Sequence, residues 1–114
     1  MLWKKRWFVL SEYCLFYYKS PDEERVSGSI LLPSYKISPT STKEDSITRK
    51  FAFKAEHKNM RTYYFAAETK DSMMQWMNAM SLGIVLNKMS KLTIFVICIF
   101  KTNLIENCKT LVYI

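Results

Sequence analysis

Two cations near the start of the chain, Lys4 and Arg6, are residue types that can bind phosphate, and they stand two positions apart. They belong to the run W-K-K-R-W-F-V-L (residues 3–10), whose aromatic and β-branched composition predicts a strand. Alternate residues of a strand share a face, so Lys4 and Arg6 are expected on the same side as Phe8 and Leu10. Arginine offers a planar fork that binds an oxyanion through two hydrogen bonds, and lysine offers a point charge.

A third candidate, Tyr17, lies in the next predicted strand, residues 14–19, which a short turn joins to the first strand as a hairpin. Across this hairpin its hydroxyl can donate a hydrogen bond to the same ligand. Lys19, Lys54 and Arg61 are expected to add to the rim of such a site. A solvated basic strand end is the alternative interpretation for the cations, and an ordinary core position is the alternative for Tyr17.

The elements that must position these residues are mostly short strands. Runs with strand character recur, separated by polar loops, at residues 28–32, 35–37, 50–54 and 61–66. The hydrophobic period then changes to that of an amphipathic helix, with one apolar face made by Met73, Trp76, Met77, Met80 and Ile84. This order predicts an α+β fold: an antiparallel roll or barrel of two packed sheets, capped by one C-terminal helix.

The ends of this helix carry their own signals. Thr69 is suited to the N-cap, and the carboxylate of Asp71 in the first turn favours the helix dipole. Gly83 stands near the expected end of the helix. The single histidine, His57, lies in a turn without carboxylate or cysteine at ligand spacing, so we expect a surface residue and no metal site.

Composition limits the functional classes. The formal net charge of +7 favours an anionic partner, which is either nucleic acid or an anionic membrane surface. The three cysteines form no C-x-x-C pair, the start of the chain has no secretion signal, and no nucleotide-binding or nucleophile-elbow motif occurs. We therefore expect a cytoplasmic protein that is not an enzyme and needs no cofactor.

Order and spacing together resemble a known family. The runs W-K-K-R-W-F-V-L, L-F-Y-Y and G-S-I-L-L-P, followed by a helix that bears Trp76, resemble a pleckstrin-homology domain over about residues 2–86. The pieces S-I-L-L-P, F-K-A-E-H and N-M-R-T-Y-Y-F look most like the phosphoinositide-binding group called pleckstrin homology domain-containing family A. We predict that residues 1–86 form this domain and that residues 87–114 form a hydrophobic tail of uncertain structure.

The resemblance implies a function and a site. In this family a K/R-x-R motif opens the second strand and a tyrosine lies on the third, and Lys4-x-Arg6 and Tyr17 match both elements. The implied function is a phosphoinositide-binding, membrane-targeting module of an adaptor or scaffold protein, peripheral at cytoplasmic membranes. The alternative is a protein- or peptide-interaction module with little lipid selectivity. Nucleic-acid binding is not expected, because the aromatic residues fall mostly on predicted core faces.

The family's first strand, which ends in a lysine, has no counterpart before Lys4. We expect its absence to leave an unpaired sheet edge beside residues 3–10. We accordingly interpret the chain as an N-terminally truncated form or fragment that aggregates when expressed alone. The apolar run at residues 92–100 is shorter than the roughly 20 residues of a membrane-spanning helix.

Overall fold

The computed structural model describes residues 3–11, 13–41, 43–47, 49–86 and 111–113. These residues contain seven strands and one helix, joined by loops. In chain order they are β1 (Lys5–Ser11), β2 (Cys14–Tyr18), β3 (Gly28–Leu31), β4 (Lys36–Pro39), β5 (Ala52–Glu56), β6 (Tyr63–Ala66), α1 (Lys70–Leu86) and β7 (Leu111–Tyr113).

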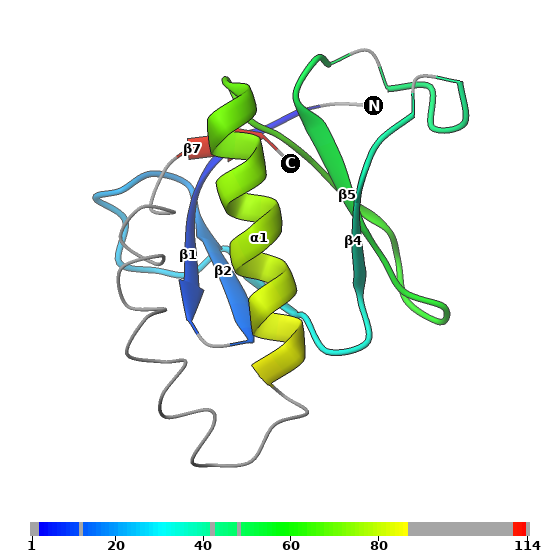
Figure 1. Cartoon of the computed structure of the whole chain (residues 1–114). Helices are drawn as coiled ribbons and strands as arrows, with labels where there is room; N and C mark the ends of the chain where they lie inside the picture. Colours follow the sequence, from blue (N-terminus) through cyan, green and yellow to red (C-terminus); the bar gives the residue numbers. More distant parts are fainter. Residues whose placement is uncertain (1–2, 12, 42, 48, 87–110, 114) are drawn as a thin grey trace.

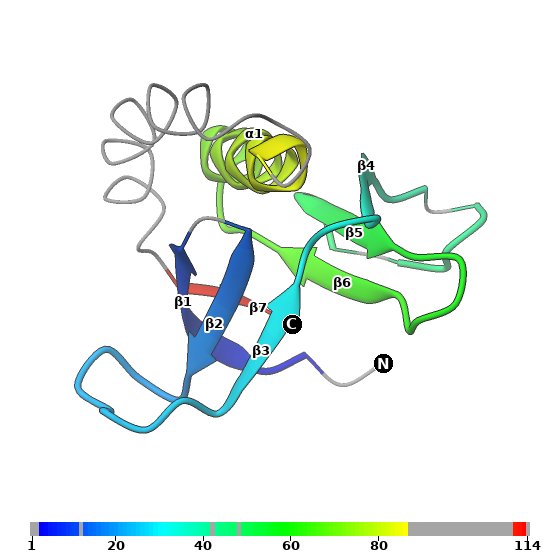
Figure 2. The same ribbon diagram turned by 90° about the horizontal axis from the view of Figure 1, so that it is seen from below.

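The strands form two antiparallel three-stranded units, with α1 packed against both (Figures 1 and 2). The complete sheet order is β3-β2-β1-β7-β6-β5-β4, so β7 is the strand that joins the first unit to the second. Within the described residues, β3 and β4 are the outer strands and do not pair with each other, so the sheet is not closed into a barrel. The expected two sheets and C-terminal helix are confirmed.

The core lies between the two units and the inner face of α1. Alternation along β1 buries Phe8 and Leu10 completely, so the face that these two residues were predicted to share is the inner face of the strand. The ring of Phe8 meets those of Phe65 and Trp76 edge to face, with centroids 5.8 and 6.1 Å apart. Aromatic pairs favour this arrangement, and it ties the first unit to the second unit and to the helix.

Helix α1 begins where the sequence predicts. Thr69 is the N-cap, because its hydroxyl oxygen accepts a hydrogen bond of 3.1 Å from the backbone N–H of Ser72. Trp76 and Met80 are fully buried on the predicted apolar face. The helix continues past Gly83 to Leu86, so the end expected near Gly83 is three residues too early. Gly83 is buried within the helix.

The two ends of the described chain meet in the sheet, where β7 pairs with the start of β1. The edge of β1 that was expected to be unpaired is occupied over its first three residues, because β7 pairs antiparallel with it through Lys5↔Tyr113, Arg6↔Val112 and Trp7↔Leu111. No described strand pairs with residues 8–11 on that edge. The predicted tail of residues 87–114 therefore includes a strand, and the rest of it lies outside the described residues. Among the described helices none is both long and apolar enough to cross a membrane.

Candidate functional site

The candidate site is built on the start of β1. Trp3, just before the strand, packs on the outer face of the second unit against Ile47, Ala52 and Ala66. This contact draws the residues that follow it toward the second unit. Lys4 is exposed there and makes no ion pair with any described residue.

Arg6 is half-buried and lies on the face that also carries the fully buried Phe8. Its Nη1 donates a hydrogen bond of 2.9 Å to the carbonyl oxygen of Lys5. A guanidinium has five N–H donors, so this bond leaves most of them for a ligand. Lys5, on the opposite face, forms an exposed ion pair of 3.6 Å with Glu68.

Two further cations come from the loop between β4 and β5. The guanidinium carbon of Arg49 lies 5.5 Å from the ring centroid of Trp3, within cation–π range. Arg49 and Lys50 also line a hollow of about 350 Å³ together with Glu68, the partner of Lys5. We call the group of cations at this end of the sheet the basic corner, and it consists of Lys4, Lys5, Arg6, Arg49 and Lys50.

The sequence did not reveal Arg49 and Lys50 as site candidates. They stand in a loop, and no period in the sequence relates a loop residue to a strand 40 or more positions away. The only signal available was their adjacency, R-K, just before the alternating run of β5.

Tyr17 lies directly opposite Phe8 in the β1–β2 ladder, and the two ring centroids are 5.7 Å apart. Its ring leans away from β1 and crosses β3 at Gly28, where a Cβ atom would overlap the tyrosine hydroxyl. Glycine therefore permits this close approach. The inner-face position agrees with the prediction, but the hydroxyl is directed toward β3 and away from Arg6.

Lys19 follows the end of β2 and is exposed. With Arg25 it lines a second hollow, of about 340 Å³, beside the β2–β3 connection. One further step of the β1–β2 register would place Lys19 opposite Arg6, so Lys19 lies at the same end of the sheet as the basic corner.

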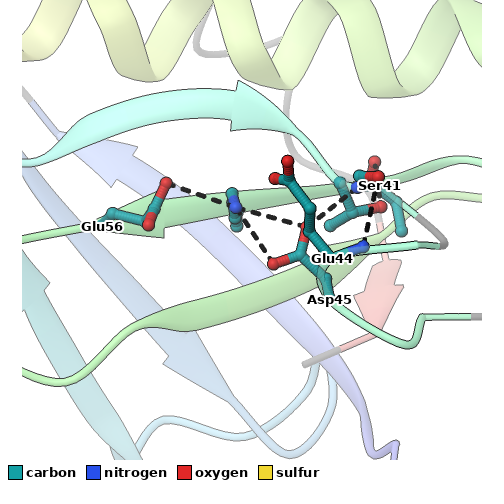
Figure 3. A network of polar contacts seen from close by, with 7 residues as sticks. Ser41, Glu44, Asp45 and Glu56 are labelled. Atoms are coloured by element: carbon teal, nitrogen blue, oxygen red, sulfur yellow. Dashed lines mark hydrogen bonds and ion pairs between the residues drawn. The ribbon is translucent and has the colours of Figure 1, made fainter.

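Lys54 has other partners. Its Nζ donates hydrogen bonds of 3.0 and 3.2 Å to the two carboxylate oxygens of Asp45, and lies 3.4 Å from Oε1 of Glu56 (Figure 3). The side chains of Lys54 and Asp45 are only 13% and 9% exposed. Lys54 thus ties the loop between β4 and β5 to strand β5, and its positive charge is already paired with the carboxylates of Asp45 and Glu56.

The same network sets the ionisation of both groups. The backbone N–H of Ser41 donates a 2.8 Å hydrogen bond to Asp45 Oδ2, and this bond, followed by the one from Lys54, lowers the pKa of Asp45. The hydrogen bond to Asp45 is likewise the main cause that raises the pKa of Lys54. Both residues are therefore charged over a wide pH range, as an ion pair that anchors the loop requires.

Arg61 lies at the opposite end of the molecule from the basic corner. Its carbonyl oxygen accepts a hydrogen bond of 3.2 Å from the hydroxyl of Tyr35, which follows the far end of β3. Its guanidinium lies over the ring of Tyr63, 4.4 Å from the centroid. The structure therefore groups Lys4, Arg6 and Lys19 at one end and leaves Arg61 apart from them.

Comparison with known proteins connects this arrangement to one family. The sequence model described as PH domain matches residues 2–85. The chain is 60% identical over 80 residues to pleckstrin homology domain-containing family A member 7 of Danio rerio, and 62% identical over 79 residues to member 5 of Homo sapiens. These matches cover 70% and 69% of this chain but only 7% of each relative.

A solved structure agrees with the sequence matches. The solution structure of the PH domain of human family A member 5 superposes with a TM-score of 0.65 at 55% sequence identity. The superposition covers 74% of this chain and 65% of that one. At this identity the likeness extends beyond the fold to the sequence itself.

Proposed function

Because the chain belongs to the pleckstrin-homology (PH) domain family, whose members are generally non-enzymatic lipid- or protein-interaction modules, we propose that it binds phosphoinositide headgroups. The supporting observation is the basic corner, the group of five cations at one end of the sheet. Lys5, Arg49 and Lys50 lie around Glu68. Lys4 and Arg6 flank Lys5 in the chain, and Arg6 lies on the opposite face of β1. Inositol phosphates present several dianions close together, and clustered arginine and lysine side chains match them.

The roles within the corner follow from geometry. Arg6 is half-buried, and its planar guanidinium is suited to bind a phosphate through two parallel hydrogen bonds. Lys4 and Lys50 are exposed and supply charge that also attracts anionic lipid in general. Tyr17 supports Phe8 beneath the site, and Lys19 extends the positive surface toward the β2–β3 connection.

In a cell this activity would make the chain a peripheral, membrane-recruiting module of a longer cytoplasmic adaptor or scaffold. The chain spans about 7% of the length of the curated relatives it matches, so a larger parent protein is consistent with the comparison.

Co-sedimentation with vesicles tests the proposal. Vesicles that contain one phosphoinositide at a time are compared with phosphatidylserine vesicles of equal charge. We expect Arg6→Ala to weaken phosphoinositide binding roughly tenfold or more, because a hydrogen-bonded charge contact contributes about 1.5–3 kcal/mol. Arg61→Ala is the matched control, since it removes the same charge at the opposite end and should change binding little. Equal losses in the two variants, or no preference for phosphoinositide, would contradict the proposed site.

The second candidate is protein binding by addition of a strand. The β3 strand is an outer strand of the sheet, and its Leu31 is 61% exposed, so its edge can accept an extended peptide. Vesicle binding that soluble inositol phosphate abolishes favours the lipid function. A chain that ignores inositol phosphates and instead binds peptides in competition at β3 would favour the second.

A further inference from the structure

The start of β1 is held from one side only. The ladder between β1 and β2 begins at Trp7↔Tyr18 and runs on to Ser11↔Cys14. Lys5 and Arg6 are not part of that ladder. Their strand partners are Tyr113 and Val112, so β7 holds the segment of β1 that β2 does not.

β7 also contacts the second unit. Tyr113 pairs with Ala66 of β6 while it pairs with Lys5 of β1. Tyr113 thus has a strand neighbour on each side, the last residue of β6 and the first residue of β1, whereas Leu111 and Val112 pair with β1 alone (Figure 2). Strand addition of this kind relies on main-chain hydrogen bonds, which any extended segment can supply.

We propose that Leu111–Tyr113 acts as an added strand from the same chain, which fixes the start of β1 and thereby positions Arg6 for the phosphoinositide headgroup. The positioning role rests on the function proposed above, whereas the strand role does not. Without β7 the start of β1 would be an unpaired strand end, and such ends open locally at low free-energy cost. Arg6 would then lose its strand pairing before any ligand arrived.

The register makes this directly testable by a cross-link. Directly opposite residues of an antiparallel pair are within the Cα separation that a disulfide bridges. In a background with all three cysteines replaced by serine, K5C/Y113C should oxidise to a disulfide within one chain and migrate as a compact monomer. The control K5C/V112C directs the second thiol to the opposite face and should not form one.

Backbone pairing is tested by two substitutions at Val112. Proline removes the N–H and restricts the backbone, whereas threonine keeps both the N–H and the side-chain shape. We expect Val112→Pro to speed amide hydrogen exchange in residues 3–7 by about tenfold or more, with residues 14–18 unchanged. Val112→Thr should exchange like the wild type.

Vesicle binding tests the positioning role separately. Val112→Pro should weaken phosphoinositide binding, and Val112→Thr should not. If the wild-type chain binds no phosphoinositide, the proposed function fails, while the cross-link and the exchange rates still decide the strand role. The inference is overturned if K5C/Y113C links no better than its control, if the link joins two chains, or if proline and threonine at residue 112 give equal exchange.

Discussion

At the scale of single residues, Gly28 has a role that its neighbours do not share. The ring of Tyr17 crosses β3 at this position, so any side chain at residue 28 competes with the tyrosine for the same space. Tyr17 in turn packs on Phe8, which lies beneath Arg6 on the same face of β1. A side chain added at residue 28 would therefore displace the ring of Tyr17, and through it the ring of Phe8, next to Arg6 of the candidate site.

Gly28→Ala should destabilise the fold. Overpacking costs about 1–3 kcal/mol, which exceeds the gain of about 0.4–1 kcal/mol from a less flexible unfolded chain. Urea unfolding of the single and double variants measures the balance. In a Tyr17→Ala background the same substitution should become neutral or stabilising, because the competing ring is gone. An equal cost in both backgrounds would show that the close approach to Tyr17 is not the cause.

Sequence reasoning at this scale succeeded where a residue's role follows from local periodicity. Strand parity placed Phe8 and Leu10 inside, and helical spacing identified Trp76 and Met80 as core. It did not reveal the ion pairs of Lys54, because the partner Asp45 lies in a loop whose path no period describes. Arg49 was missed for the same reason.

At the scale of elements, the described residues of the loop between β4 and β5 contribute to the candidate site. Asp45 anchors it to β5, Ser46 turns the chain with a positive φ of 55°, and Ile47 is buried directly afterwards. The loop then delivers Arg49 to the ring of Trp3. Its conformation therefore decides whether two of the five cations reach the basic corner.

This anchor predicts a specific pH dependence. The pKa of Asp45 is lower in the folded protein than its ordinary 3.8, so its stabilising contribution is complete above that value and is lost as the pH falls through the lowered pKa. Asp45→Asn removes the contribution at neutral pH. Thermal unfolding should then show a lower Tm at pH 7, by a few degrees, and a gap to the wild type that narrows below about pH 4.

Glu44→Gln is the matched control for Asp45→Asn. Glu44 is the adjacent acid in the same loop, and its carboxylate is exposed and outside the bonds to Lys54 (Figure 3). It should leave the Tm and its pH dependence close to those of the wild type. If the gap between Asp45→Asn and the wild type stayed constant down to pH 2, the ionised carboxylate would not be the anchor.

The elements themselves show what sequence patterns can and cannot supply. Each hairpin was predictable because both strands and their turn are adjacent in the chain. Strand β7 was not, since three residues in an apolar tail carry no distinct period, and their partner on β1 is more than 100 positions away. The sequence predicted an open edge along β1, and this was wrong over the three residues that β7 pairs with, Lys5–Trp7.

At the scale of the whole molecule, net charge and the candidate site would make different contributions to the proposed membrane binding. The charge of +7 attracts any anionic surface, and this attraction is screened over the Debye length, which falls from about 10 Å at 0.1 M to about 3 Å at 1 M ionic strength. Direct contacts between Arg6 and a phosphate are screened much less.

Salt titration should therefore separate the two contributions. As ionic strength rises from about 0.1 to 1 M, binding to phosphatidylserine vesicles should be largely lost, and the preference for phosphoinositide vesicles should increase. Arg6→Ala should lower the residual binding at high salt more than Arg61→Ala does. Parallel loss on both kinds of vesicle would indicate general attraction alone.

The pairing of β1 with β7 also determines how the molecule would respond to mechanical force. Lys5 and Tyr113 are opposite each other at the outer end of that ladder, so a pull that separates the two chain ends acts across its hydrogen bonds. Such a load opens one residue pair at a time instead of shearing all of them together. Tension between flanking segments would peel β7 from Lys5 first and then from Arg6, while the β1–β2 ladder remained intact. Within this ladder, the start of β1, which carries Lys5 and Arg6 of the basic corner, would then be the first part to lose its strand partner.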